Sequence, residues 1–183
     1  MEISGEYRIP AARERVWAAL NDPDMLQKCL PGCESMEKVG DDEMHADVTA
    51  AIGPVRAKFR TRLSLENPDP PNGYTLAGES KAGAAGFARG RADVALAPED
   101  DATRLTYRAE LKVGGKLAQV GSRLVAGATR KTADEFFRNL ARELDSNALP
   151  ADREAAPAMR ASRWPMAAGA LLALVIILWL LLR

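Results

Sequence analysis

Residues 116–144, KLAQVGSRLVAGATRKTADEFFRNLAREL, are the stretch that decides the fold. Apolar residues recur along it at steps of three and four, a spacing that places them on one face of an α-helix. The sequence therefore predicts one long helix with a broad apolar face, which needs an apolar surface to pack against. The apolar positions are Leu117, Val120, Leu124, Ala128, Phe136, Leu140 and Leu144.

The segments ahead of this helix predict the surface that it covers, an antiparallel sheet. Residues 44–52 and 55–65 alternate between apolar and polar side chains, which is typical of strands with one buried face. Three more strands are expected at residues 72–81, 88–97 and 103–113. The sheet would then offer one apolar face to the helix.

The first two of these strands predict a hairpin with a defined register. Gly53-Pro54 favours a tight turn, in which Ile52 lies opposite Val55. Asp47 then faces Arg60 across the hairpin. We therefore interpret the outward basic row of the second strand as a solvated sheet face rather than an anion site.

The N-terminal part of the chain predicts one strand and two short helices. Residues 2–9 suggest the strand, and residues 11–20 suggest a helix with Pro10 at its start. Asp22-Pro23 opens a second helix that runs to Leu30. The expected order is one strand, two helices, six strands and the long helix, although only five of the six can be assigned to residues.

This order predicts an α+β fold of the helix-grip type, in which an antiparallel sheet wraps around a long C-terminal helix. A concave sheet under a single helix leaves an apolar cavity unless large side chains fill it. Small residues are frequent where the two should meet, as in residues 82–90, AGAAGFARG, and at Gly121 and Gly127. They indicate either open space or close backbone packing.

The side chains expected to line such a cavity combine an inward position with nearness to the helix. Each is equally consistent with a plain hydrophobic core. The ten candidates are Met25, Leu26, Met44, Phe59, Phe87, Leu117, Val120, Gly121, Leu124 and Val125.

Catalytic and metal-binding patterns are weak in this sequence. His45 is the only histidine and is expected on the outward face of its strand, which disfavours a Ser–His or Cys–His pair. Cys29 and Cys33 are the only cysteines, whereas a zinc site needs four ligands, so we interpret them as buried structural thiols. No catalytic residue, no metal and no covalently bound cofactor is expected, and the chain is predicted not to be an enzyme.

The C-terminal tail predicts a membrane anchor. Residues 166–182, MAAGALLALVIILWLLL, carry no charge and would span roughly 26 Å as a helix, close to the apolar thickness of a bilayer. A buried core helix is the alternative interpretation. The expected organisation is a ligand-binding domain at residues 1–145, a flexible linker at 146–163 and a transmembrane anchor at 164–183.

Charges beside the tail predict its orientation. Arg153, Arg160 and Arg163 precede the hydrophobic stretch, and only Arg183 follows it. The positive-inside rule then places the domain on the cytoplasmic face of the inner membrane, held by a single-pass C-terminal anchor. The chain has 25 acidic and 25 basic residues and no basic, aromatic-interleaved patch, so no nucleic-acid partner is expected.

Four stretches resemble the CoxG family of carbon monoxide dehydrogenase subunits, which is part of the SRPBCC, or START-like, superfamily. The resemblance covers residues 1–145, with the motifs in the same order, and the tail is similar to that of anchored members. The stretches are CLPGCESME (29–37), IGPVRAKF (52–59), DPPNGYTLAGESKAGAAGFARG (69–90) and VGGKLAQVGSRL (113–124).

This resemblance implies a function that spacing and periodicity do not show. CoxG-like proteins are associated with recruiting a molybdenum hydroxylase of the xanthine-oxidase type, such as aerobic carbon monoxide dehydrogenase, to the membrane. A hydrophobic cavity held at a bilayer also suits a respiratory quinone as the carried ligand. The family offers no catalytic motif that could be transferred to this chain.

Two other functions stay open at the level of sequence. The domain could be a tether without a ligand. It could also be a START-like cyclase or hydrolase, which would need polar groups in the cavity, and Tyr107, Thr61 and Arg89 are the only candidates.

Overall fold

A computed structural model describes residues 1–146. The predicted anchor at 164–183 and all of the predicted linker except Ser146 lie outside the described residues. Among the described residues, no helix is both long and apolar enough to cross a membrane. The elements in chain order are β1 (Glu2–Ile9), α1 (Arg13–Leu20), α2 (Pro23–Cys29), β2 (Cys33–Lys38), β3 (Glu43–Ile52), β4 (Val55–Asp69), β5 (Gly73–Lys81), η1 (Gly83–Ala85), β6 (Phe87–Glu99), β7 (Ala102–Gly114), α3 (Lys116–Gln119) and α4 (Ser122–Ser146).

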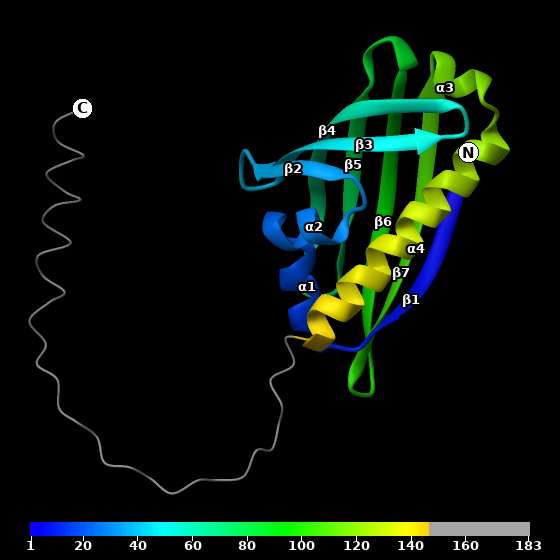
Figure 1. The fold of residues 1–183 in the computed structure, drawn as a ribbon. Helices are drawn as coiled ribbons and strands as arrows, with labels where there is room; N and C mark the ends of the chain where they lie inside the picture. Colours follow the sequence, from blue (N-terminus) through cyan, green and yellow to red (C-terminus); the bar gives the residue numbers. More distant parts are fainter. Residues whose placement is uncertain (147–183) are drawn as a thin grey trace, which may run out of the picture. The chain divides into compact units, whose positions relative to one another are not determined.

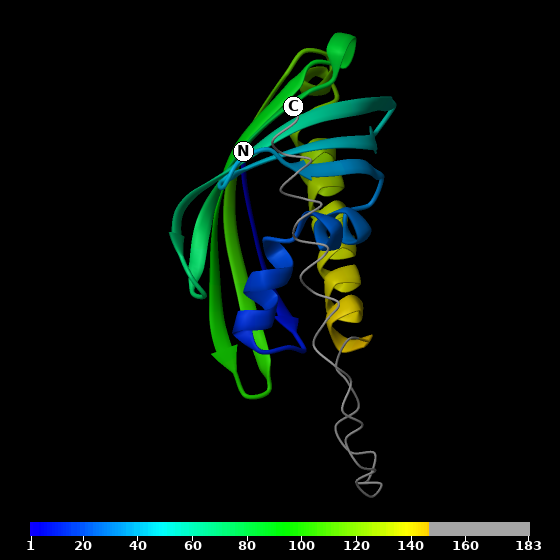
Figure 2. The same ribbon diagram turned by 90° about the vertical axis from the view of Figure 1, so that its left-hand side faces the viewer.

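The seven strands form a single antiparallel sheet in the order β1-β7-β6-β5-β4-β3-β2. The strands β2 to β7 follow one another as a meander, while β1 pairs with β7 at the far edge. The sheet curves, and α4 runs diagonally across its concave face (Figures 1 and 2). The expected α+β helix-grip fold is therefore confirmed for the described part of the chain.

The predicted hairpin register is confirmed. Ile52 pairs with Val55, and Asp47 pairs with Arg60, along an uninterrupted β3–β4 ladder. The sixth strand, which the sequence pattern does not locate, is β2 at the sheet edge. Its pairing with β3 contains an irregularity between Cys33 and Ser35. A short edge strand of this kind shows little apolar alternation, because only one of its residues, Met36, is buried.

The long C-terminal helix is not continuous, which corrects the prediction of one helix over residues 116–144. It is broken between α3 and α4, at Val120 and Gly121. Gly121 has a φ of 95°, a backbone conformation that side chains with a Cβ atom disfavour. The break changes the direction of the chain, so that Leu117 is buried whereas Leu124 is 55% exposed. The apolar stripe therefore does not continue across it.

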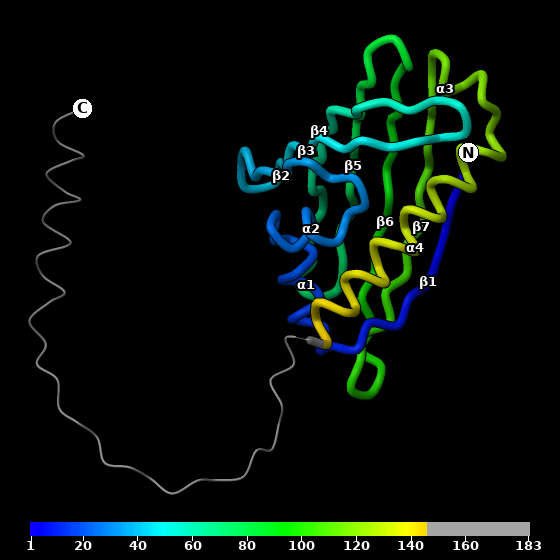
Figure 3. The backbone as a smooth tube through the Cα atoms, in the orientation of Figure 1, coloured from blue at the N-terminus to red at the C-terminus, as the bar shows by residue number. Residues whose placement is uncertain are grey.

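Buried side chains gather in three separate clusters rather than in one continuous core. The largest lies where α1 and the C-terminal half of α4 meet the sheet, around Val16, Leu105 and Leu140. A second lies under α2 around Met44, and a third lies below α3 around Phe59 and Leu117. Figure 3 shows α1 and α2 beside the C-terminal part of α4, opposite α3. The space between the clusters is where the sheet and helix are not in close contact.

Alanine substitutions at Gly121 and Gly127 separate the effect of the backbone conformation at the break from that of helix propensity. A Cβ atom at either position would meet nothing within 4 Å, so neither Gly121→Ala nor Gly127→Ala creates a clash. We expect Gly121→Ala to lower the free energy of unfolding by about 1–2 kcal/mol, because of its positive φ. Gly127→Ala, inside α4, should raise it by about 0.5–1 kcal/mol. Urea-induced unfolding of residues 1–146 measures both changes in the free energy of unfolding. Equal changes in the two variants would contradict the positive φ assigned to Gly121.

Candidate ligand-binding site

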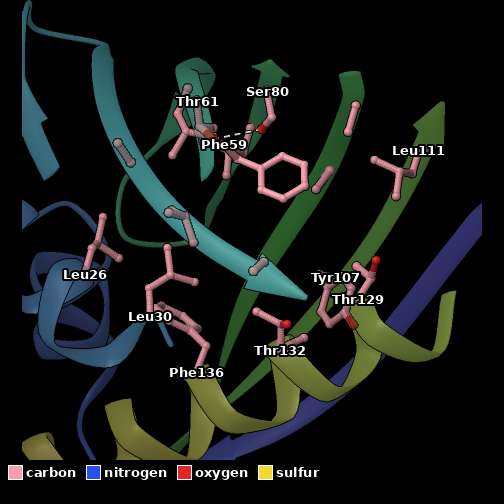
Figure 4. Close-up of a pocket in the computed structure, with 18 of the residues that line it drawn as sticks. Leu26, Leu30, Phe59, Thr61, Ser80, Tyr107, Leu111, Thr129, Thr132 and Phe136 are labelled. Atoms are coloured by element: carbon pink, nitrogen blue, oxygen red, sulfur yellow. Dashed lines mark hydrogen bonds between the residues drawn. The ribbon is translucent and has the colours of Figure 1, made fainter. Parts of the chain in front are cut away.

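A cavity of about 510 Å³ lies between the concave face of the sheet and α4. Inward positions of β3 to β7 form its walls, α4 closes it, and Leu26 and Leu30 border it on the α2 side (Figure 4). Within the described chain its lining carries no charged side chain. The polar side chains that line it all bear hydroxyl groups, and they are Thr61, Tyr74, Ser80, Tyr107, Thr129 and Thr132.

One pair of hydroxyl groups belongs to neighbouring strands at the Phe59 side of the cavity. Thr61 of β4 lies opposite Ser80 of β5, and their Oγ atoms are 2.8 Å apart, a hydrogen bond drawn in Figure 4. Each hydroxyl can donate one bond and accept two, so the pair keeps one proton that is not used between them. It can therefore offer a hydrogen bond to a ligand without leaving a buried group unsatisfied.

A second polar region surrounds Tyr107 on β7. Its ring covers Gly5, its partner on β1, where a Cβ atom would lie 2.7 Å from the ring. Tyr7 stacks against Phe137 of α4 at a centroid distance of 4.3 Å. The Tyr7 hydroxyl donates a hydrogen bond of 2.7 Å to Asp134 Oδ1. These contacts join the cavity wall to a carboxylate at the protein surface.

The two tyrosines remain neutral donors near neutral pH. Burial, followed by the hydrogen bond to Asp134, raises the pKa of Tyr7 far above its ordinary value. Burial also raises the pKa of Tyr107. A phenol held protonated can donate a hydrogen bond to a carbonyl oxygen, but it cannot serve as a base. The arrangement therefore suits recognition of an acceptor group rather than proton abstraction.

Five of the ten side chains predicted for the cavity line it in the structure. They come from α2, β3, β4, α3 and α4, and the structure brings them together around one space. Their contact with a ligand stays a prediction. These five are Leu26, Met44, Phe59, Leu117 and Val125.

The other five predicted residues lie elsewhere, which corrects their placement. Met25 packs against the cluster around Leu105. Phe87 is on the outer face of β6 and is 40% exposed, because strand alternation turns its neighbour Ala88 inward instead. Gly121 lies at the break itself, which carries Val120 and Leu124 towards the β3–β4 turn at Gly53.

The sequence pattern does not identify most of the wall formed by β5 to β7 and by the middle of α4. Ala88 and Ala92 of β6 line the cavity, as do Tyr107 and Leu111 of β7. The alternation of residues 103–113 is a pattern from which the inward positions of β7 could be identified. On α4 the sequence pattern gives an apolar face, but it does not show which turns of the helix lie above open space.

The remaining candidates for chemistry lie outside this cavity. His45 is on the outer face, as expected, and its Nε2 lies 2.7 Å from Glu43 Oε1. Arg89 also points outward, where it pairs with Glu79 at 3.1 Å and lies over the Phe87 ring. Within residues 1–146 no group of three potential ligands could hold a metal ion. Of the two free thiols, Cys29 is fully buried.

The thiol of Cys29 provides a test of this packing. Burial raises its pKa to about 11, whereas an unfolded cysteine has a pKa of about 8.5. Because only the thiolate reacts, alkylation by iodoacetamide at about pH 8.5 should be at least two orders of magnitude slower in the folded domain than in urea. The raised pKa also means that the thiol's contribution to stability is lost as pH rises from about 8.5 to 11. Mass spectrometry of the alkylated peptides measures this, and rapid native labelling of Cys29 would contradict it.

Comparison with known families finds one matching family model. The model is described as CoxG, a subunit of carbon monoxide dehydrogenase, and it matches residues 5–145. This range covers the cavity lining and almost all of the sheet and of α4. No functionally curated protein matches the chain.

Solved structures with the same fold include one that is also similar in sequence. A conserved protein from Geobacillus kaustophilus is 31% identical, with a TM-score of 0.75, over 80% of this chain and 96% of that chain. A START superfamily protein from Mycobacterium smegmatis is 13% identical, with a TM-score of 0.62, over 79% and 97%. The Zhui aromatase/cyclase from a Streptomyces species is 10% identical, with a TM-score of 0.62, over 82% and 97%. The last two comparisons show the fold alone.

Proposed function

The chain belongs to the CoxG family of carbon monoxide dehydrogenase subunits, and we propose that it is a membrane-anchored accessory protein that carries a respiratory quinone in its cavity. The observation that supports this most directly is the uncharged cavity of about 510 Å³ with hydroxyl donors in its wall. Its volume lies in the range of sites for small organic ligands, which are mostly apolar with a few placed polar groups.

A quinone matches the chemistry of this lining. Its ring and isoprenoid tail are apolar, and its two carbonyl oxygens accept hydrogen bonds but donate none. Tyr107 and the Thr61–Ser80 pair are donors on different walls of the cavity. Because lipid is about as apolar as the cavity, transfer between them would cost little free energy, and the ligand would exchange readily.

The proposed partner is a molybdenum hydroxylase of the carbon monoxide dehydrogenase or xanthine oxidase type. The family name supports an association with carbon monoxide dehydrogenase. Residues 164–183 would anchor the domain at the cytoplasmic face of the inner membrane. The domain would then hold a soluble enzyme beside the lipid phase that contains its electron acceptor.

Two alternatives make different predictions. A tether without a ligand requires no cavity, so filling the cavity would leave electron transfer intact. An enzyme requires a catalytic group in the cavity. Of its three sequence candidates, Tyr107 and Thr61 line the cavity, whereas Arg89 does not. Turnover of a substrate by the isolated domain would support that alternative.

Trp17 gives a direct readout of ligand binding to residues 1–146. It is the only tryptophan in this range, and its ring lies 5.5 Å from that of Tyr74, which lines the cavity. We expect a soluble quinone such as decylubiquinone to quench its fluorescence. Ala128→Phe should weaken this binding at least tenfold, because the added ring occupies the cavity, whereas Ala95→Phe on the outer face of β6 should not.

The outcome of that titration separates the carrier from the tether. If Ala128→Phe removes the quenching, the result supports a quinone carrier. Electron transfer between this variant and the partner enzyme should then fall in parallel. Absence of quenching in the unmodified domain, or equal quenching in Ala128→Phe, contradicts it. Circular dichroism of both variants shows whether the fold is retained.

Removing the tail tests the recruitment. When the full chain is produced together with the partner hydroxylase, we expect both in the membrane fraction after cell lysis. A chain that ends at residue 146 should leave both in the soluble fraction. A hydroxylase that remains with the membranes without residues 147–183 would show that this chain does not anchor it.

A further inference from the structure

The topology sorts the turns of the meander to two ends of the domain, and their charges differ. Because the strands are antiparallel, every second turn falls at the same end. The basic end comprises residues 51–58, 81–89 and 112–124, which together hold seven basic and no acidic residues. The acidic end comprises residues 39–43, 66–72 and 98–102, which together hold eight acidic and no basic residues. The domain is therefore electrostatically polarised.

Contacts between turns bring the basic residues together. A Cβ atom on Gly53 of the β3–β4 turn would lie 3.2 Å from Val120 Cγ1 and 3.7 Å from Leu124 Cδ1. The β5–β6 loop packs its Gly86 against Gly115. The turn, η1 and α3 lie near one another in both ribbon views (Figures 1 and 2). The three segments thus form one surface.

Several of these cations lack an acidic partner. Lys58 and Arg89 form ion pairs. In contrast, no acidic side chain of the described residues forms an ion pair with Arg56, Lys116 or Arg123, all of which are exposed. A cluster of unpaired charges of one sign produces an electrostatic field that attracts an oppositely charged surface.

Exposed apolar side chains lie on the same end. Leu124 is 55% exposed at the start of α4, and Phe87 is 40% exposed at the start of β6. Ala51, which lines the cavity, is also exposed here. Apolar groups surrounded by cations are the combination with which proteins bind the interface of anionic membranes.

We propose that the basic end is a docking surface for an anionic lipid bilayer. Leu124 and Phe87 would enter the headgroup region, and Arg56, Lys116 and Arg123 would face the lipid phosphates. The acidic end would point away from the membrane. This deepens the proposed function, because it gives the cavity a fixed orientation towards the lipid that supplies its ligand.

The length of the chain permits this orientation. Helix α4 starts at the basic end, and its 25 residues span about 37 Å. Residues 147–163, which precede the predicted anchor in sequence, can reach at most about 60 Å when extended. The anchor and the basic end could therefore engage the same bilayer.

Vesicle sedimentation of residues 1–146 tests the proposal without the tail. The Geobacillus kaustophilus relative, 96% of which is matched within a similar range, shows that a domain of this extent folds by itself. We expect binding to vesicles of phosphatidylglycerol and phosphatidylcholine in equal parts, little binding to phosphatidylcholine alone, and a marked loss of binding in high salt. Equal binding to both vesicle types would overturn the proposal.

Equivalent charge changes at the basic end and away from it show which surface contacts the membrane. Neutralising two charges at the basic end, Arg56→Gln with Arg123→Gln, should weaken partitioning by about 30-fold, from the loss of two cations near the surface. Neutralising Arg8 and Arg104 to Gln, away from the basic end, should have little effect.

A second pair of variants tests how much the exposed apolar side chains contribute to membrane binding. Leu124→Ser should weaken binding about tenfold, whereas Val39→Ser, at an equally exposed side chain of the acidic end, should not.

Equal losses in the matched variants, or no binding of the unmodified domain, would overturn the proposal, and the second result would favour an acidic protein as the partner. Quenching of Trp17 by a quinone is measured separately. A failed docking surface is thereby distinguished from a failed carrier function.

Discussion

The structure depends on a mismatch in width between one helix and the sheet that it covers. Seven strands spaced about 4.8 Å apart extend over roughly 29 Å, whereas a helix with its side chains is about 10–12 Å wide. The sheet curves around α4 but cannot close on it everywhere. Helices α1 and α2 fill one end and α3 fills the other, so the space that remains lies in the middle. The cavity is thus a consequence of the architecture, and its walls are the apolar faces that the sheet must bury.

What occupies the inward positions then decides the character of this space. Alanines at 88, 92 and 128 leave volume that larger residues would fill. Thr61 and Ser80 bond to each other, and the hydroxyl of Thr129 donates to the carbonyl of Val125. Buried charges are costly without partners, and the described lining contains none. The result is a space that favours an apolar molecule with hydrogen-bond acceptors.

The same meander that builds the wall also separates the charges. Acidic turns such as Asp100-Asp101 alternate along the chain with basic or glycine-rich ones such as residues 82–86. Antiparallel pairing collects the first kind at one end and the second kind at the other. A chain with equal numbers of acidic and basic residues therefore folds into a polarised domain. Cavity and polarity follow from one topology, which relates ligand binding to orientation at a surface.

The sequence by itself determined the features that depend on neighbours in the chain. Alternation indicated most of the strands, and the Gly53-Pro54 turn indicated the register that pairs Asp47 with Arg60. Motifs in the same order as in the family were enough to indicate that family. Only the tertiary structure decided features that depend on distant segments: the short edge strand β2, the break at Gly121, the outward position of Phe87 and the gathering of the charged turns. Periodicity reports the relative phase of residues within an element. It does not report which way that element faces or how closely another approaches, because these are set by packing across the whole domain.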